Sequence, residues 1–197
     1  PVDYVVEGDY SLAAYLLAAG LIAGRVAVSG LNPHTRQPDA RIIEVMRRMG
    51  GVVKVSGSSV TAEKSELRGI KVDARDMPDL VPVIAVLGAY ARGETRIANV
   101  ERLRFKESDR VAALLSELGK MGVKITYSKG ELIVKGSRVR GARVDGHKDH
   151  RIVMACAVAA LGAEGETVVD GVKYVSKSYP NFVRDISKMG ATVRVVG

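Results

Sequence analysis

The sequence has few of the residues on which many specialised folds depend: its 197 residues include one cysteine, two phenylalanines and no tryptophan. The single cysteine, Cys156, excludes an internal disulfide, and its Ala- and Val-rich surroundings predict a small core residue rather than a nucleophile. No apolar run approaches the roughly 20 residues of a membrane-spanning helix, so we expect no membrane partner. The start at Pro1 shows no signal peptide, and the lack of an initiating Met indicates a processed or excised chain. The single cysteine fits a reducing, cytoplasmic setting.

Motifs for metals and nucleotides are also lacking. The three histidines, His34, His147 and His150, do not show a His-x3-His spacing, and no second cysteine is present to form a Cys-x2-Cys pair. The phosphate-cradling loops G-x4-G-K-S/T and G-x-G-x-x-G do not occur. We therefore expect neither a metal site nor a bound nucleotide.

Acidic residues are outnumbered by basic ones, 22 against 30, which gives a net charge of +8. A basic surface is typical of proteins that bind nucleic acid or small anionic substrates. The few aromatic residues and the lack of a long Lys/Arg run argue against nucleic acid, and we expect no such partner. A basic RNA-binding domain stays open as a rival hypothesis, and a non-catalytic repeat scaffold as another.

Two phrases recur along the chain at a common interval of about 70 residues, which is the signature of a repeated supersecondary unit. One begins with Met-Gly and the other with Gly followed by a strand-like run. They stand at 49–53, 121–125 and 189–193, and at 24–28, 93–97 and 165–169. The chain therefore consists of three copies of one unit.

Each copy predicts the element order β-α-β-α-β-β. In the first copy, a strand at 4–6 precedes a helix that Asp9 or Ser11 caps and that residues 20–24 end. A strand at 25–29, a second helix and a hairpin over 52–62 follow. The later copies repeat this order, and the third ends with a strand at 192–196 that has no hairpin partner.

The three units, at about residues 1–66, 67–137 and 138–197, are each too small to bury an apolar face alone. We therefore expect a single α+β domain in which the units close on one core with pseudo-three-fold symmetry. The helices should lie at the centre and the sheets outside.

Charged residues gather where these helices are expected to begin. Lys106, Arg110, Arg151 and Lys177 all lie at such starts. A cation is unfavourable there because a helix N-terminus already carries partial positive charge, and a bound anion would offset that cost. Equivalent helices of a three-fold repeat point the same way, so we expect one end of the domain to bind phosphate and carboxylate groups.

These polar motifs resemble, in order, those of the 5-enolpyruvylshikimate-3-phosphate synthase family, and the resemblance covers essentially the whole chain. The related UDP-N-acetylglucosamine enolpyruvyl transferases share the fold, but the Lys-Glu-Ser-Asp-Arg and Lys-Ser-Tyr-Pro strings fit the shikimate enzymes better. The motifs stand at 6–11, 76–80, 106–110, 149–151 and 177–180.

The resemblance implies a reaction, in which the enolpyruvyl group of phosphoenolpyruvate passes to the 5-hydroxyl of shikimate 3-phosphate and phosphate is released. The family uses no metal or organic cofactor. By motif, Asp79 would hold the shikimate hydroxyls and act as the base, and Lys106 would contact shikimate 3-phosphate and assist proton transfer. Glu107 would be the acid or base at the methylene carbon. The residues that would hold phosphoenolpyruvate are Arg110, Arg151 and Lys177, with His150 beside them.

The chain departs from the family in one respect. Family members place further Lys, Ser, Arg and Gln motifs in a second domain, and none of them occurs here. The resemblance therefore implies a C-terminal domain, whose partner is the missing N-terminal domain of the same protein. In the family, the extreme N-terminus helps to complete this domain, which fits the unpaired last strand. We expect the chain to fold and to be inactive alone.

Overall fold

A computed structural model describes residue 3 and residues 6–196, and in it each repeat contributes a layer of helix and sheet. The first comprises α1 (Tyr10–Ala23), β1 (Arg25–Val28), η1 (Pro38–Arg41), α2 (Ile42–Arg48), β2 (Val52–Ser56) and β3 (Ser59–Glu63). The second comprises β4 (Lys71–Asp73), η2 (Pro78–Leu80), α3 (Val81–Tyr90), β5 (Glu94–Ala98), η3 (Glu101–Phe105), α4 (Arg110–Lys120), β6 (Lys124–Ser128) and β7 (Glu131–Lys135). The third comprises β8 (Arg143–Asp145), α5 (His150–Ala160), β9 (Val168–Asp170), η4 (Val172–Lys177) and α6 (Phe182–Lys188).

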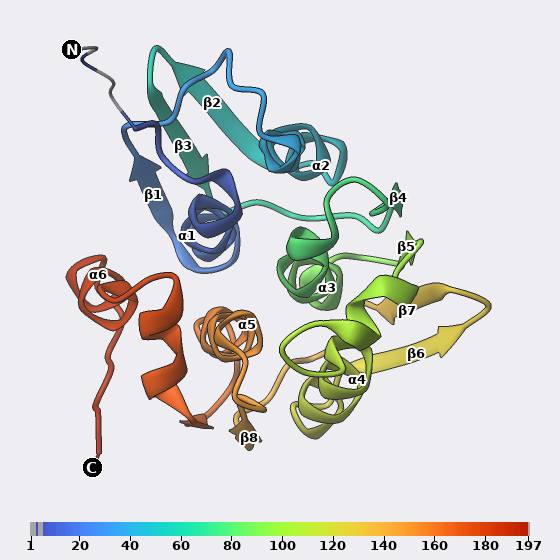
Figure 1. The fold of residues 1–197 in the computed structure, drawn as a ribbon. Coiled ribbons are helices and arrows are strands. Elements are labelled where there is room, and N and C mark those ends of the chain that lie inside the picture. Colours follow the sequence, from blue (N-terminus) through green and yellow to red (C-terminus); the bar gives the residue numbers. More distant parts are fainter. Residues whose placement is uncertain (1–2, 4–5, 197) are drawn as a thin grey trace.

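Helices α1, α3 and α5 pack against one another at the centre, and the sheets lie outside them (Figure 1). The described residues form sheets of order β1-β3-β2, β4-β5-β7-β6 and β8-β9. In the second sheet, β4 runs parallel to β5, whereas β5, β7 and β6 are antiparallel neighbours. The predicted α+β fold with central helices is confirmed, and the second repeat displays the predicted element order in full.

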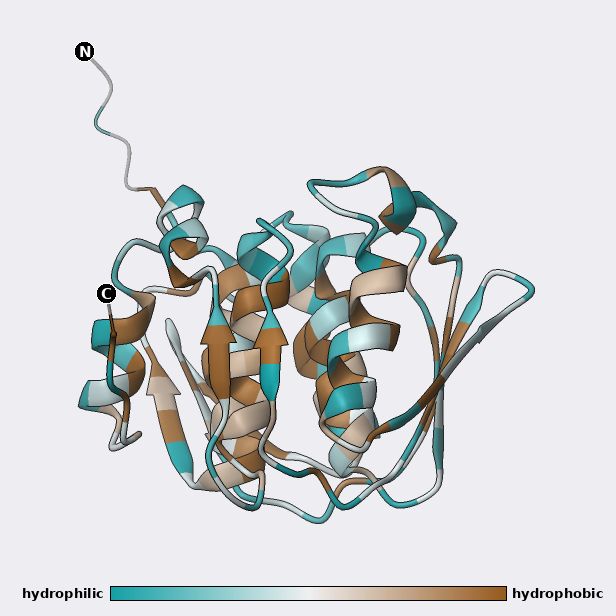
Figure 2. Cartoon of the chain, turned by 90° about the horizontal axis from the view of Figure 1, so that it is seen from below, coloured by the Kyte–Doolittle hydropathy of each residue, from teal (hydrophilic) through white to brown (hydrophobic). Residues whose placement is uncertain are grey.

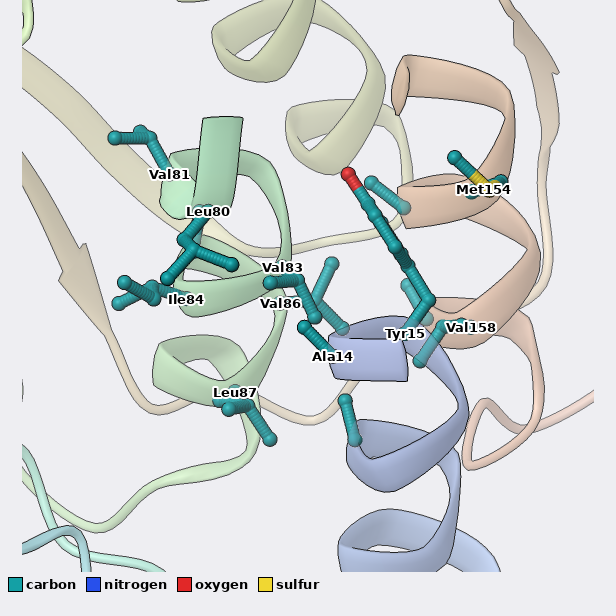
Figure 3. Packing of buried hydrophobic residues seen from close by; sticks show 14 of the residues in the cluster. Ala14, Tyr15, Leu80, Val81, Val83, Ile84, Val86, Leu87, Met154 and Val158 are labelled. Atoms are coloured by element: carbon teal, nitrogen blue, oxygen red, sulfur yellow. The ribbon is translucent and has the colours of Figure 1, made fainter. Parts of the chain in front are cut away.

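The central helices are apolar around most of their circumference because they are enclosed by protein. In α3, the residues from Val81 to Ala89 are all buried, as expected for a helix without a solvent face. Figure 3 shows Tyr15 of α1 lying against α5 beside Val158, near side chains of α3. In Figure 2, brown apolar segments occupy the interior, whereas teal polar segments lie at the helix ends and loops. The helix ends are therefore the places where polar side chains can meet.

One local prediction for the first repeat needs correction. Gly20 does not begin the end of α1, which continues to Ala23 and is capped by Gly24. A Cβ at residue 20 would lie 2.7 Å from the carbonyl oxygen of Ala62, so Gly20 allows close packing on β3. Asp9 caps α1, accepting from the amides of Ser11 and Leu12. The strand predicted at 4–6 falls partly on residues 4 and 5, outside the described residues.

The strand predicted at 192–196 is wrong: these residues carry no strand pairing. The third sheet consists of β8 and β9, so the described residues include no counterpart of β7, the strand with which β6 pairs in the second repeat. Without that neighbour, residues 192–196 have no described strand to pair with. Val193, Val195 and Val196 are exposed as a consequence. The alternation of apolar residues predicted a strand here, but such a pattern does not show whether a neighbouring strand is present to pair with it.

Cys156 lies in α5 and is 1% exposed, which confirms its interpretation as a core residue. Its burial raises the pKa of the thiol to about 12, so the thiol is protonated at neutral pH. Within the part of the chain that the structure describes, none of the helices has the length and apolar character to cross a membrane.

Candidate functional site

A buried arginine stands at the point where the starts of α4 and α5 meet. Arg110 is the first residue of α4, and its side chain is 1% exposed. Its Nε donates to Oδ2 of Asp149 at 2.8 Å, its Nη1 to Oδ1 of Asp79 at 2.8 Å, and its Nη2 to Oε2 of Glu107 at 2.6 Å. One guanidinium thus joins carboxylates from three parts of the chain.

Asp149 holds this arrangement because one side chain performs two tasks. It is fully buried and caps α5, accepting from the backbone amide of Arg151 at 2.9 Å. The same carboxylate accepts from Arg110 and, at 3.1 Å, from the hydroxyl of Ser108. The start of α5 is thereby fixed against the start of α4.

The remaining cations of the site pair with the same carboxylates. Asp79 accepts from Nη2 of Arg151 at 3.1 Å and lies 3.4 Å from Nζ of Lys106. Glu107 accepts from Nζ of Lys177 at 2.7 Å. Six of the seven predicted site residues therefore form one connected network, which the order of the motifs along the chain does not reveal.

Both outer carboxylates are held in the ionised form. Partial burial would raise the pKa of Asp79, but Arg151, Arg110 and Lys106 together lower it below its usual range. Burial likewise opposes ionisation of Glu107, but the hydrogen bond from Lys177 and the charge of Arg110 lower its pKa to about 2. While these cations pair with them, neither carboxylate can donate a proton near neutral pH.

His150, the seventh predicted residue, lies beside this network at the start of α5. It is 5% exposed, and its Nδ1 has no hydrogen-bond partner among the described residues. Burial, together with the neighbouring charge of Arg151, lowers the pKa of its ring, so the ring is neutral near pH 7.

Two other buried polar atoms in the same region have no partner within residues 6–196. These are Nη1 of Arg151, whose residue is 7% exposed, and Oγ of Ser178, which follows Lys177. A buried guanidinium N–H without an acceptor is costly, and a carboxylate or phosphate oxygen is its natural partner. The unpaired donor of Arg151 therefore indicates an anion site.

An acidic depression of about 430 Å³ adjoins the network at Asp79. Asp39 lines this depression, although the sequence did not mark it as a site residue. Burial, together with the nearby negative charge of Asp79, raises the pKa of the Asp39 carboxyl group. In the portion described, no three or more His, Cys, Asp or Glu side chains are arranged to hold a metal ion. Asp149 was also missed as a site residue, although it stands in the quoted Asp-His-Arg motif and is spaced as a helix cap.

Comparison with known proteins identifies the family. The model of the family "EPSP synthase (3-phosphoshikimate 1-carboxyvinyltransferase)" matches residues 1–186. Across 197 residues the chain is 48% identical to the 3-phosphoshikimate 1-carboxyvinyltransferase of Aeropyrum pernix, covering all of this chain and 46% of the relative. It is 46% identical to the enzyme of that name from Methanocaldococcus jannaschii, covering 99% of this chain and 46% of the relative.

Solved structures agree with this assignment. An EPSP synthase from Acinetobacter baumannii superposes with a TM-score of 0.86 at 25% identity, covering 98% of this chain and 48% of the other. The enolpyruvyl transferase NikO from Streptomyces tendae shares the fold, with a TM-score of 0.80 at 24% identity over 98% of this chain and 45% of the other. The chain spans about half the length of the curated relatives it matches. It belongs to the EPSP synthase (3-phosphoshikimate 1-carboxyvinyltransferase) family.

Proposed function

We propose that this chain is the C-terminal domain of an enzyme that transfers the enolpyruvyl group of phosphoenolpyruvate to the 5-hydroxyl of shikimate 3-phosphate and releases phosphate. The observation that carries the proposal is the buried Nη1 of Arg151, which has no hydrogen-bond partner among the described residues. It lies in a network of four cations and three carboxylates. Such a network has a net positive charge and a free donor, as the capture of a small anion requires.

Phosphoenolpyruvate would bind at the Arg151 side of this network. Arg151 offers its free Nη1 to the carboxylate or phosphate, and Lys177, whose side chain is 59% exposed, can turn toward the ligand. Arg110 would contribute charge from within, since its N–H groups already serve Asp149, Asp79 and Glu107. His150 would lie beside the bound anion as a neutral ring.

Shikimate 3-phosphate would bind at the Asp79 side. Asp79 would accept from the sugar-like hydroxyls of the ring and take the proton of the 5-hydroxyl as its oxygen attacks C2 of phosphoenolpyruvate. Lys106, 3.4 Å from Asp79, would contact the phosphorylated substrate and assist this proton transfer. The two substrates would then be held with the reacting atoms adjacent.

Glu107 would exchange the proton at the methylene carbon of phosphoenolpyruvate. Its low pKa in the free chain depends on Lys177 and Arg110, so an anion that neutralises those cations raises the pKa toward a working range. Glu107 would protonate C3 as the 5-hydroxyl oxygen bonds to C2, and would recover a proton from C3 as the bond between C2 and the phosphate oxygen breaks. The proton that Asp79 took from the 5-hydroxyl would pass to the departing phosphate. Substrate binding would therefore prepare the acid.

The partner of this domain would be the N-terminal half of the same protein, which would supply further groups for both anions. The exposed segment at 192–196 would gain a strand partner when that half is present. The chain alone would be inactive, and a cytoplasmic location stays a prediction. The RNA-binding hypothesis gains no support from the relatives. The matching family and the relatives compared above carry the name of the shikimate enzymes, which favours shikimate 3-phosphate over UDP-N-acetylglucosamine as the substrate.

The test combines binding and turnover. Phosphoenolpyruvate and shikimate 3-phosphate are titrated into ¹⁵N-labelled chain, with and without the half of the Aeropyrum pernix relative that this chain does not match. We expect amide shifts around Asp79, 106–110, 150–151 and Lys177, and phosphate release only when both halves are present. Arg151→Met should abolish the shifts, whereas Arg143→Met, which removes an exposed pair with Asp170, should not.

Two outcomes contradict the proposal in different ways. Turnover by the chain alone would refute its role as half of an active site. Absence of both shifts and turnover in the mixture, with the two halves shown to associate, would refute the function itself.

A further inference from the structure

A second buried charge lies on α4, two turns beyond Arg110. Glu117 is 1% exposed, although a carboxylate in such a position must lose its water. Its oxygens accept from Nζ of Lys120 at 2.7 Å, the backbone amide of Asp145 at 2.8 Å, Nε2 of His147 at 2.9 Å and Oγ of Ser116 at 2.8 Å. These bonds outweigh the effect of burial and lower the pKa of Glu117 to about 2.

Two of the bonds to the Glu117 carboxylate come from a short segment that leads into the candidate site. Residues 145–149 connect the end of β8 to Asp149, the cap of α5. Within them, His147 and Lys148 both have positive φ angles, 51° and 55°, which are unfavourable for residues other than glycine. A conformation of this kind persists only where surrounding contacts hold it.

Both ends of this segment are fastened to the same helix. At one end, Glu117 binds the amide of Asp145 and the ring of His147. At the other end, Arg110 binds the carboxylate of Asp149. Since α4 is a continuous helix between the two points, it fixes where α5 begins. The positions of His150 and Arg151 follow from that start.

We propose that Glu117 is a positioning residue for the phosphoenolpyruvate side of the site, acting through the 145–149 segment on His150 and Arg151. This inference rests on the proposed function. Asp79 and Lys106, on the shikimate 3-phosphate side, come from η2 and from the end of η3, and among the described residues neither bonds residues 145–149. Their link to the segment is indirect, through the 3.1 Å bond from Nη2 of Arg151 to Asp79. Loss of Glu117 should therefore weaken phosphoenolpyruvate binding much more than shikimate 3-phosphate binding, whereas a general loss of stability would affect both alike.

The experiment measures KM for each substrate in the two-half protein described above. Glu117→Met keeps the length of the side chain and removes every acceptor. We expect KM for phosphoenolpyruvate to rise about tenfold, which corresponds to weakening one charge-assisted bond. KM for shikimate 3-phosphate should stay within about twofold. Lys120→Met is the matched control, because it removes a bond to the same carboxylate without touching the segment.

A second variant keeps the test decisive if Glu117→Met does not fold. His147→Leu removes one bond from a side chain that is 35% exposed, and we expect a smaller rise, about threefold, in the same KM. An equal rise in both KM values, or a lower melting temperature with both KM values unchanged, would refute the positioning role. A wild-type mixture whose halves associate but show neither ligand-induced shifts nor turnover would instead refute the proposed function.

Discussion

The charge on Asp149 offers the sharpest test of how the network is held together. In Asp149→Asn, the amide oxygen can still cap α5, because it can accept from the amide of Arg151. The negative charge that faces Arg110 is lost, and so is the two-oxygen contact with its Nε and Nη2, at 2.8 and 3.3 Å. The variant therefore separates the ion pair from the helix cap.

The size of the effect follows from burial. Removing one partner of a buried ion pair costs about 3–5 kcal/mol, because the other charge stays uncompensated. Arg110 keeps Asp79 and Glu107 as partners, so we expect the lower end of that range, about 3 kcal/mol. For a domain of this size, each kcal/mol lowers the melting temperature by about 2–4 °C, so the fall should be about 6–12 °C.

Thermal unfolding followed by circular dichroism measures this fall, and Asp109 supplies the control. It caps α4 as Asp149 caps α5, and its ion pair with Arg104 is exposed. Asp109→Asn should cost less than about 1 kcal/mol, as exposed pairs do. Equal falls for the two variants would refute the view that a buried charge pair, rather than a cap, holds the starts of α4 and α5 together.

Three further predictions address acid, charge and packing. The pKa of Glu117 is about 2 in the folded chain, against 4.5 for an ordinary Glu side chain, as in the unfolded chain. Its contribution of up to about 3 kcal/mol to the free energy of unfolding should therefore be present above pH 4.5 and lost as the pH falls toward 2. The unfolding free energies of wild type and Glu117→Met, measured with urea, should converge over that range. Lys177→Met should raise the pKa of Glu107, because it removes the 2.7 Å bond that favours the carboxylate, and carboxyl ¹³C shifts against pH would show no movement if the pair is unimportant. Gly146→Ala should destabilise the fold by about 1–3 kcal/mol, because its Cβ would overlap a valine methyl group of α5, whereas Gly119→Ala in α4, with no described atom within 4 Å of a Cβ, should be neutral or stabilising by thermal unfolding.

The repeat was predictable from sequence because its markers are local. A Met-Gly pair that ends a helix and a Gly that starts a strand recur with one period, as Met121-Gly122 and Gly93 do, and each has a local physical reason. Gly93 and Gly122 both adopt positive φ angles, 87° and 82°, which favour glycine. Period and chemistry together predicted the element order and the central helices.

The pairing within the site was not predictable, because it depends on distances between repeats. Arg110 and Asp149 are 39 positions apart, and Arg151 and Asp79 are 72 apart. Sequence alone placed these residues at helix starts but could not tell which carboxylate would meet which cation. The strand at 192–196 failed for the same reason, since pairing requires a neighbour that the pattern of one segment does not describe.

The cations at the helix starts differ in whether they need a bound anion to compensate their charge. Three of the four cations have carboxylate partners that account for them without a ligand: Arg110 has three, Lys106 has Asp79, and Lys177 has Glu107. Their placement alone is therefore weak evidence for an anion. Arg151 is different, because it is buried and bonds Asp79 through Nη2, whereas its Nη1 has no acceptor within the described part of the chain. If an anion binds here, Nη1 of Arg151 should be its first contact. The pKa values of the neighbouring carboxylates should then rise, because the anion competes with them for the same cations.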